Sequence, residues 1–424
     1  MKKIARSIVV EILGWQVRRL RRKNSFKIIG VAGSIGKTST KLAVASMLSQ
    51  GFRVRFQEGN YNDLVSAPLV FFGQSMPTLL NPFGWAKIFI NNELCLRRLY
   101  PFDYIILELG VDGSGQLIQF KKYLQLDMGI LTSLTSEHME FFKSLDEVAK
   151  EELQIQNLSR KLLVNNDLCD DKYLNQVSQD SVTYGIHQKS DYMLTNIQST
   201  ADGYDFSAVE NDEVLIEKGH SKLISEIQLY SLCCAVAVGK ESGMSKQQLK
   251  SGVDSVKPMN GRMQILKGAK DSTIIDDTYN AGPETMKAAL DTLYRVKSQQ
   301  KIALLGNMNE LGKFSADAHL DIGNYCDPKH LKLVITIGND ANRYLAKAAE
   351  AKGCDVKRFN SPYKAGEYLK RMLKPDAIVL AKGSQNGVFA EEAIKQILAD
   401  PKDASKLVRQ SSRWLKFKRE KFES

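Results

Sequence analysis

The chain has 424 residues, 43% of them hydrophobic and 25% charged, a length and composition typical of two or three globular domains. No apolar run approaches the roughly 20 residues that span a bilayer, and six scattered cysteines without a C-x-x-C pair argue against a zinc ribbon or a disulfide framework. The formal charge of +11 lies at the two ends of the chain. Residues 1–25 carry +7 (eight basic, one acidic) and residues 405–424 carry +5 (seven basic, two acidic), which leaves −1 for the remaining residues. This distribution argues against a basic groove that binds nucleic acid.

The first predicted element is an amphipathic helix within residues 1–25. Its apolar side chains recur on one face at Ile4, Ile8, Ile12 and Trp15, and a basic cluster follows them at 18–23. Two interpretations stay open: the basic termini make peripheral contact with an anionic membrane surface, or the apolar stripe packs against the protein. Because the basic cluster follows the apolar part and no small-residue cleavage site is present, we expect a cytoplasmic protein, with the inner membrane surface as a second location.

Strand, glycine turn and helix follow in that order, the strand at Lys27–Ala32 and the helix at Thr38–Leu48. Further strand-like runs alternate with helical stretches, at 104–110, 128–134 and 161–166, and again at 273–277, 301–306, 333–338 and 377–383. This alternation predicts an α/β fold with two domains. We place them at 26–257 and 258–400, with a boundary near 256–262 and a basic tail at 401–424.

The turn at residues 30–38, GVAGSIGKT, carries the clearest chemistry. Its glycines let backbone N–H groups surround phosphate oxygens at the start of a helix. Lys37 would reach the terminal phosphates, and the Thr38 hydroxyl would bind Mg²⁺. The strict Walker spacing requires a glycine where Val31 stands, so the alternative is a glycine turn with a solvent-exposed lysine.

Glu108 ends the predicted strand YIILE, and the carboxyl edge of an open α/β sheet faces its binding crevice. We expect Glu108 to be a second Mg²⁺ ligand. A helix-capping or surface role is the alternative for an isolated glutamate.

Together these residues resemble the Mur ligase family, whose phosphate loop reads G-x-x-G-x-x-G-K-[ST]. Later motifs of the family occur in order, in the branch that adds D-alanyl-D-alanine to a UDP-muramyl tripeptide. They are GNYND at 59–63, APL at 67–69, ELGVDGSG at 108–115, TSLTSEHMEFFKSLDEVAKEEL at 132–153, NGRM at 260–263, DDTYNAGPETMKAAL at 276–290, GNMNELG at 306–312 with His319, and KGSQ at 382–385.

The resemblance implies a P-loop-type central ATPase domain with a mostly parallel sheet and a C-terminal Rossmann-like α/β domain. It also implies a peptide ligase of peptidoglycan and cell wall biogenesis that uses ATP and Mg²⁺. The γ-phosphate is transferred to a carboxylate to form an acyl phosphate, which an amine then attacks. Positioning and charge neutralisation carry most of such a reaction.

The family's functional residues transfer to this sequence as follows. Nucleotide binding falls to Gly33, Ser34, Ile35, Gly36, Lys37, Thr38, Ser39, Gln228, Arg262 and Asp277. Metal binding falls to Thr38, Glu108 and His138, and substrate binding to Asn60, Asn62, Tyr279, Asn280 and Lys382. Catalysis is assigned to Lys37, Glu108, His138 and Glu152.

Several features depart from the family pattern. Only about 25 residues precede the first strand, so the family's N-terminal UDP-sugar domain is not expected and the acyl substrate stays open. The aromatic stretch 71–101 is either a substitute binding surface or a packed loop and helix. Glu152 stands where many members carry a carbamylated lysine, and SEIQLYS at 225–231 replaces the motif for the adenine side, where Gln228 could still bind a base. Three single-residue departures affect the acceptor and nucleotide contacts: Asn307 for Asp, Gly282 for Asn and Gln385 for Arg.

Two other functions remain as alternatives to the D-alanyl-D-alanine ligase. One is another amide ligase on the same scaffold, forming polyglutamate or amidating a precursor. The other is a membrane-tethered scaffold that binds nucleotide without turnover. The retained phosphate and metal ligands argue against the scaffold, because a decayed site loses such ligands first.

Overall fold

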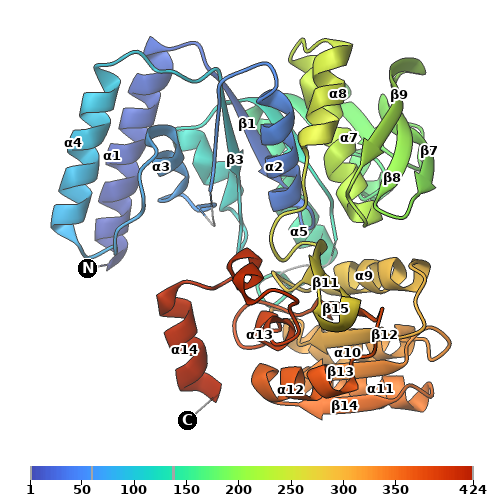
Figure 1. Ribbon diagram of the computed structural model, residues 1–424. Helices are drawn as coiled ribbons and strands as arrows, with labels where there is room; N and C mark the ends of the chain where they lie inside the picture. Colours follow the sequence, from blue (N-terminus) through green and yellow to red (C-terminus); the bar gives the residue numbers. More distant parts are fainter. Residues whose placement is uncertain (1, 59–60, 136–138, 423–424) are drawn as a thin grey trace. The chain divides into compact units, whose positions relative to one another are not determined.

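The computed structural model describes residues 2–58, 61–135 and 139–422 (Figure 1). The chain forms two compact units. The first comprises residues 1–136, 141–222 and 228–257, and the second comprises 137–140, 223–227 and 258–424. Each unit is built around its own mixed sheet, so the predicted α/β fold class is confirmed.

The sheet of the first unit has nine strands in the order β2-β3-β1-β4-β5-β6-β7-β8-β9. Neighbours from β2 to β7 are parallel, and β8 and β9 add antiparallel to β7. The strands are β1 Lys27–Ala32, β2 Val54–Phe56, β3 Tyr104–Glu108, β4 Leu126–Leu131, β5 Ser159–Asn165, β6 Val182–Gly185, β7 Tyr192–Ser199, β8 Tyr204–Glu210 and β9 Glu213–Ser221. The central strands β1, β3 and β4 are almost wholly buried, as expected of a parallel sheet covered on both faces.

The helices of this unit are α1 Lys2–Lys23, α2 Lys37–Leu48, α3 Ala67–Phe72, α4 Pro82–Leu96, α5 Leu145–Glu152, α6 Asp171–Leu174, α7 Glu226–Glu241, which begins in the second unit, and α8 Lys246–Ser255. Two 3₁₀ segments lie at Leu117–Lys122 and Leu153–Leu158. Every residue of α7 from Gln228 to Gly239 is buried, which is why its sequence is apolar on all sides.

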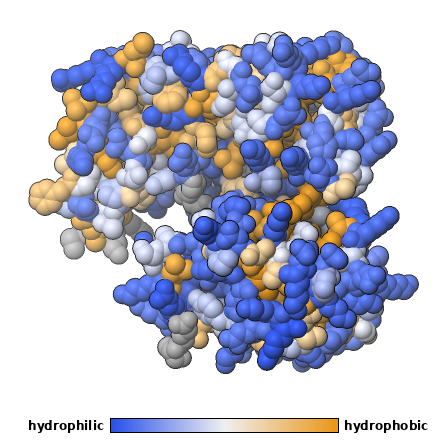
Figure 2. Space-filling view, in the orientation of Figure 1, coloured by the Kyte–Doolittle hydropathy of each residue, from blue (hydrophilic) through white to orange (hydrophobic). Residues whose placement is uncertain are grey.

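The N-terminal helix α1 lies beside α4 (Figure 1). Its buried face is formed by Val9, Val10, Leu13, Val17 and Leu20. The predicted stripe does not pack in this way, because Ile4, Ile8 and Trp15 are exposed. Figure 2 shows hydrophobic residues gathered at the upper left, over the part of the molecule that α4 and α1 form.

The second unit holds a six-stranded sheet in the order β10-β11-β15-β12-β13-β14, parallel except for β10. Its strands are β10 Gln264–Lys267, β11 Thr273–Asp277, β12 Lys301–Gly306, β13 Leu333–Ile337, β14 Val356–Phe359 and β15 Ile378–Lys382. Its helices are α9 Pro283–Arg295, α10 Ser315–Tyr325, α11 Ala346–Ala351, α12 Pro362–Met372, α13 Glu391–Lys395 and α14 Ser412–Phe422, with a π-helical turn at Ala341–Leu345. Short 3₁₀ turns lie at Ala269–Asp271, Gly312–Phe314 and Pro401–Lys406.

Two hydrophobic cores cover the two faces of this sheet. Successive residues of one strand enter opposite cores: Ala303 belongs to one, while Ile302 and Leu304 belong to the other. The continuous apolar runs of the sequence therefore mark buried parallel strands. No helix in the described part of either unit is long and apolar enough to cross a membrane.

Candidate active site

The phosphate loop is the turn between β1 and α2, and two glycines shape it. Gly33 (φ +120°) and Gly36 (φ +87°) adopt left-handed backbone that glycine tolerates without strain. A Cβ on Gly33 would lie 2.4 Å from Thr132 Oγ1, so the loop passes too close to the segment after β4 for any side chain. Gly36 is the N-cap of α2 and directs the chain into the helix.

The first half of the loop is held by the protein itself. Ser34 N donates to Ser133 O at 3.0 Å, and Ile35 N donates to Ser133 Oγ at 2.7 Å. Gly33 N donates to Glu152 Oε2 at 2.8 Å. The backbone N–H groups of Gly33, Ser34 and Ile35 therefore donate hydrogen bonds to other residues of the protein. The sequence predicted that they would face a phosphate.

The second half of the loop keeps its donors at the start of α2. The first hydrogen bond of this helix runs from Thr40 N to Gly36 O, so the N–H groups of residues 36–39 have no partner within the helix. The positive end of the helix dipole adds to them. Of the predicted nucleotide-binding residues, Gly36, Lys37, Thr38 and Ser39 thus have the geometry of an anion site.

The Lys37 side chain folds back over this loop. Its Nζ donates to Ser34 O at 2.9 Å and to Gly33 O. The ammonium group thereby lies across the turn, and its two carbonyl partners fix its position. Lys37 and Thr38 are both half-buried.

Glu108 lies at the end of β3, directly beside the phosphate loop. The parallel register pairs it with Val31 of β1, two residues before Gly33. Its carboxylate is buried, with Oε2 at 3.2 Å from Nζ of the buried Lys41 on α2. Its backbone N donates to Gln57 Oε1 at 2.8 Å. These contacts fix a carboxylate, one oxygen of which is paired, next to the helix start.

Two adjacent glutamates at the end of α5 accept hydrogen bonds from backbone N–H groups of the site. Glu152 is buried and accepts the hydrogen bond from Gly33 N. Glu151 is also buried and accepts from Gly115 N and Leu117 N, both at 2.6 Å, so it holds the ELGVDGSG segment. The carboxylate of Glu152 therefore reaches the phosphate loop on an unmodified side chain.

Asn62 packs against the turn after β3. Its carbonyl accepts from Gly110 N at 2.9 Å, and a Cβ on Gly110 would lie 2.3 Å from Asn62 Nδ2. Asn62 also lines a polar pocket of about 530 Å³ whose wall includes Arg6, Ser7 and Gln116. Two predicted residues, Asn60 and His138, lie outside the described residues.

Gln228 lies in the first turns of α7, where its side chain is buried. A hydrogen bond from Gln228 to the nucleotide base stays a prediction.

In the second unit, Asp277 and Lys382 form a buried pair at the ends of β11 and β15. The two residues are register partners, and Lys382 Nζ lies 2.5 Å from Asp277 Oδ2. Lys382 Nζ also donates to Asn280 O at 3.0 Å, and Met263 N donates to Asp277 Oδ1 at 3.2 Å. The structure thus brings Asp277, Asn280 and Lys382 together in one cluster.

Tyr279 lies on the same loop. The Arg262 guanidinium stacks over its ring at 4.4 Å from the ring centroid, and Tyr279 N donates to Gly261 O at 3.0 Å. The neighbouring Asp276 is fully buried, and burial raises its pKa to about 7 although Thr278 donates to it. The predicted residues of the second unit therefore share one loop and its immediate supports.

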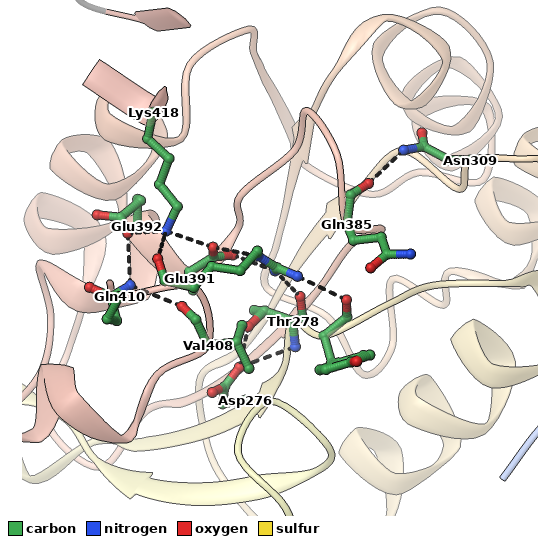
Figure 3. A network of polar contacts seen from close by, with 11 residues as sticks. Asp276, Thr278, Asn309, Gln385, Glu391, Glu392, Val408, Gln410 and Lys418 are labelled. Atoms are coloured by element: carbon green, nitrogen blue, oxygen red, sulfur yellow. Dashed lines mark hydrogen bonds and ion pairs between the residues drawn. The ribbon is translucent and has the colours of Figure 1, made fainter. Parts of the chain in front are cut away.

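The C-terminal segment also supports this loop (Figure 3). Arg409 donates to Thr278 O at 2.5 Å and to Tyr279 O at 3.0 Å, and its guanidinium pairs with the buried Glu391 at 2.8 Å. Lys418 of α14 is buried and pairs with Glu391 and Glu392. The basic tail predicted to reach a surface therefore has two of its cations bound inside its own unit.

One departure from the family pattern, Asn307, has a structural role. Asn307 Oδ1 accepts from Ala341 N at 2.9 Å, at the start of the π-helical turn. Asn309 Nδ2 donates to the backbone carbonyl of Gln385 at 2.7 Å (Figure 3). His319 is buried between Met308 N, which donates to its Nε2, and Ser315 O, and burial lowers its pKa. These side chains join loops of the second unit.

Known protein families match both units. A model described as the Mur ligase middle domain matches residues 31–239, and one described as the Mur ligase glutamate ligase domain matches residues 261–385. The chain belongs to the Mur ligase family. As a Mur ligase it is an ATP-dependent enzyme that forms amide bonds.

Individual relatives of this Mur ligase agree with that assignment. The UDP-N-acetylmuramoyl-tripeptide–D-alanyl-D-alanine ligase of Bacillus subtilis is 26% identical over 88% of this chain and 76% of its own length. The enzyme of the same name from Synechocystis is 28% identical over 91% of this chain and 77% of its own length.

Solved structures share the fold. MurF ligase from Thermotoga maritima, in complex with ADP, aligns with a TM-score of 0.74 at 21% identity, over 94% of this chain and 84% of that one. Folylpolyglutamate synthase from Mycobacterium tuberculosis, complexed with ADP and AMPPCP, aligns with a TM-score of 0.66 at 15% identity, over 90% and 92%.

The residues present suit the magnesium ion that the family implies. Glu108 and Thr38 offer a carboxylate and a hydroxyl, the hard oxygen donors that Mg²⁺ prefers. Within the described ranges, no group of three or more His, Cys, Asp or Glu could hold a metal. Mg²⁺ needs few protein ligands, because this ion keeps waters and binds substrate phosphates.

Three residues of the site were missed in the sequence. Lys41 pairs with Glu108, Ser133 holds the phosphate loop, and Arg409 holds the Tyr279 loop. Lys41 could have been found, since it lies one helical turn after Lys37 on the same face. Arg409 carried no sequence signal, because the two carbonyls that it holds, those of Thr278 and Tyr279, lie about 130 residues away in the chain.

Proposed function

We propose that this Mur ligase joins D-alanyl-D-alanine to the terminal carboxylate of a UDP-muramyl tripeptide, through an acyl phosphate. The observation that carries the proposal is the phosphate loop, where Lys37 lies across a helix start and Glu108 lies on the adjacent strand. The names of the relatives, which align over most of this chain, support the choice of substrates.

In the proposed reaction, a carboxylate oxygen of the tripeptide attacks the γ-phosphorus of ATP, and ADP leaves. The amine of D-alanyl-D-alanine then attacks the acyl carbon, and inorganic phosphate leaves as the amide forms. We assign residues 26–257 to the ATPase domain and 258–400 to the C-terminal ligase domain. Lys37 and the N–H groups of residues 36–39 neutralise the phosphate charge that develops in the first step.

Glu108, Thr38 and His138 are the proposed ligands of Mg²⁺, which would neutralise phosphate charge when bound. The buried Lys41 holds the Glu108 carboxylate in one position. Glu152 supplies a negative charge at the loop where other family members use a carbamylated lysine. Because it bonds Gly33 N, it also fixes the shape of the loop.

Arg262 and Asp277 are the proposed nucleotide-binding residues of the second unit, and Gln228 the proposed contact to the base. Tyr279, Asn280 and Lys382 are proposed to act in substrate binding. Lys382 also holds this loop in shape, because its Nζ pairs with Asp277 and donates to Asn280 O.

For the acyl substrate we propose the pocket beside Asn62. Its lining includes the side-chain amides of Asn62, Gln116 and Gln119, which suit the amides of a muramyl peptide. Its two cations, Arg6 and Lys122, pair with Asp63 and Glu11 of the same lining. Gly110 of the same lining follows Glu108 by two residues, so a peptide held there would have a short path to the phosphate loop. The reaction is placed in the cytoplasm, where ATP is supplied.

A substrate screen that measures released phosphate tests the proposal. Phosphate release should require both UDP-muramyl tripeptide and D-alanyl-D-alanine, and mass spectrometry should detect the pentapeptide product. Release that depends on glutamate or ammonia would assign the chain to polyglutamate formation or precursor amidation. Nucleotide binding without release in any mixture would support the scaffold.

A further inference from the structure

Exposed hydrophobic side chains concentrate on one part of the first unit. Sixteen large hydrophobic side chains are exposed within the described ranges, and nine of them lie in α1 or in residues 76–99 around α4. They are 37% to 88% exposed: Ile4, Ile8, Trp15, Met76, Leu80, Phe83, Ile90, Leu94 and Leu99. Figure 2 shows the corresponding hydrophobic area over these helices. A cluster of this kind marks an interaction surface.

On each helix the exposed residues form a stripe opposite the buried face. On α1 they are Ile4, Ile8 and Trp15, spaced by four and seven residues, and on α4 they are Phe83, Ile90 and Leu94, spaced by seven and four. Both spacings keep side chains on one side of a helix. We call this pair of stripes the α1/α4 surface.

Polar contacts fix the two helices side by side. Asn92 Nδ2 donates to Gln16 Oε1 at 2.8 Å, and both side chains are buried. Arg19 Nη1 donates to both oxygens of Glu93 at 2.8 Å, and Lys23 Nζ donates to Leu96 O at 3.3 Å. Later residues of α1 meet later residues of α4, so the helices run parallel and their basic ends come together.

Positive charge borders the α1/α4 surface. Arg22 and Lys23 end α1, and Arg97 and Arg98 follow α4, all four exposed. Residues 1–25 carry a net charge of +7. Trp15 lies beside a basic residue, with the Arg19 guanidinium 4.3 Å from its ring centroid. Apolar stripes with tryptophan and phenylalanine beside basic residues are typical of helices that lie in the interface of an anionic bilayer.

We propose that the α1/α4 surface binds the surface of an anionic phospholipid membrane, with the helices lying in the interface rather than spanning it. The positive charge of the α1/α4 surface favours an anionic membrane over a second copy of the chain. A second copy of the chain would present the same net positive charge on this surface, and like charges facing across an interface are unfavourable. Phospholipid headgroups supply the opposite charge, and the acyl boundary accepts the apolar stripes. The proposal is independent of the ligase reaction.

Binding of the full-length protein to vesicles tests the proposal. We expect co-sedimentation with vesicles of phosphatidylcholine and phosphatidylglycerol, little with phosphatidylcholine alone, and weakening by salt. The double variant Ile8→Glu/Ile90→Glu should lower the affinity at least about tenfold, and Arg97→Gln/Arg98→Gln by about fivefold for each charge removed. Ile265→Glu, at an exposed isoleucine in the second unit, should leave binding unchanged.

Tryptophan fluorescence gives a direct signal from the α1/α4 surface. Of the three tryptophans, Trp15 is exposed, Trp85 is buried and Trp414 is half-buried in the second unit. The emission should shift to the blue on anionic vesicles, and Trp15→Phe should remove the shift while binding persists. The thermal unfolding midpoint of every variant should match that of the wild type. Equal binding of wild type and double variant would overturn the proposal. The proposal would also be overturned if the protein bound no vesicles and formed a dimer in sedimentation velocity that the double variant dissociates.

Discussion

At the scale of single residues, the site depends on a few side chains whose partners are fixed by the backbone around them. Lys37 is held over the phosphate loop by Ser34 O and Gly33 O. Glu108 and Glu152 bring two carboxylates to the same loop from β3 and α5. Charge at the loop is therefore placed by three separate elements, and each contribution can be removed separately.

The substitution Lys37→Ala should abolish turnover. It removes the ammonium group that neutralises the phosphate charge in the transition state, an effect on the order of a hundredfold or more in kcat. The measurement is the rate of phosphate release with both substrates present. Lys189→Ala, at a lysine whose side chain is 89% exposed, is the matched control and should behave as wild type. A near-normal rate for Lys37→Ala would remove the loop from the mechanism.

The substitution Glu152→Gln should lower kcat by about tenfold to a hundredfold. Glutamine can still accept the hydrogen bond from Gly33 N, so the loop keeps its shape while the negative charge is lost. Steady-state rates and the unfolding midpoint should be measured together, with the exposed Glu217→Gln as control. Unchanged activity would mean that no carboxylate is needed at this position.

At the scale of the elements, local sequence patterns located most of the sheets. The runs at 273–277 and 301–306 are β11 and β12 with unchanged bounds, because buried parallel strands are continuous apolar runs. The strands β2, β6 to β10 and β14 were not predicted. In β7 and β8 buried residues alternate with more exposed ones over short lengths, and the β8–β9 turn depends on left-handed backbone at Asn211 and Asp212.

The site was predictable only in part, for a related reason. The glycine loop and Glu108 are local features, a turn and a strand end, and the sequence carries both. The partners of these residues are not local: Glu152 meets Gly33 across 119 residues, and Thr40 Oγ1 meets Ser231 Oγ across 191. Likewise, which face of α1 is buried depends on α4, so the apolar stripe of α1 alone did not determine it.

The substitution Arg409→Lys should weaken ATP binding without loss of the fold, because the loop that Arg409 holds follows Asp277 directly and carries the ring against which Arg262 stacks. Lysine keeps the charge beside Glu391 but cannot pair with Glu391 and hold both Thr278 O and Tyr279 O at once. We expect KM for ATP to rise about tenfold, equivalent to about 1.4 kcal/mol, with kcat much less affected. The exposed Arg413→Lys is the control. An unchanged KM would show that the C-terminal segment has no part in positioning the Tyr279 loop.

At the scale of the whole molecule, two units each contribute a compact cluster. The first holds the phosphate loop, Glu108 and Glu152, and the second holds Asp277, Lys382 and the Tyr279 loop. Family membership covers both units, and residues 1–30 and 386–424 lie outside the matched ranges. These outer segments form α1 and the tail that supports the Tyr279 loop.

The central claim is that the γ-phosphoryl group of ATP is transferred to a carboxylate of the acyl substrate. Isotope transfer tests it most directly. UDP-muramyl tripeptide labelled with ¹⁸O in its reacting carboxylate should be ligated to D-alanyl-D-alanine, and the released inorganic phosphate analysed by mass spectrometry. The account predicts one ¹⁸O atom in each phosphate formed with the amide product. Amide product accompanied by unlabelled phosphate would contradict it.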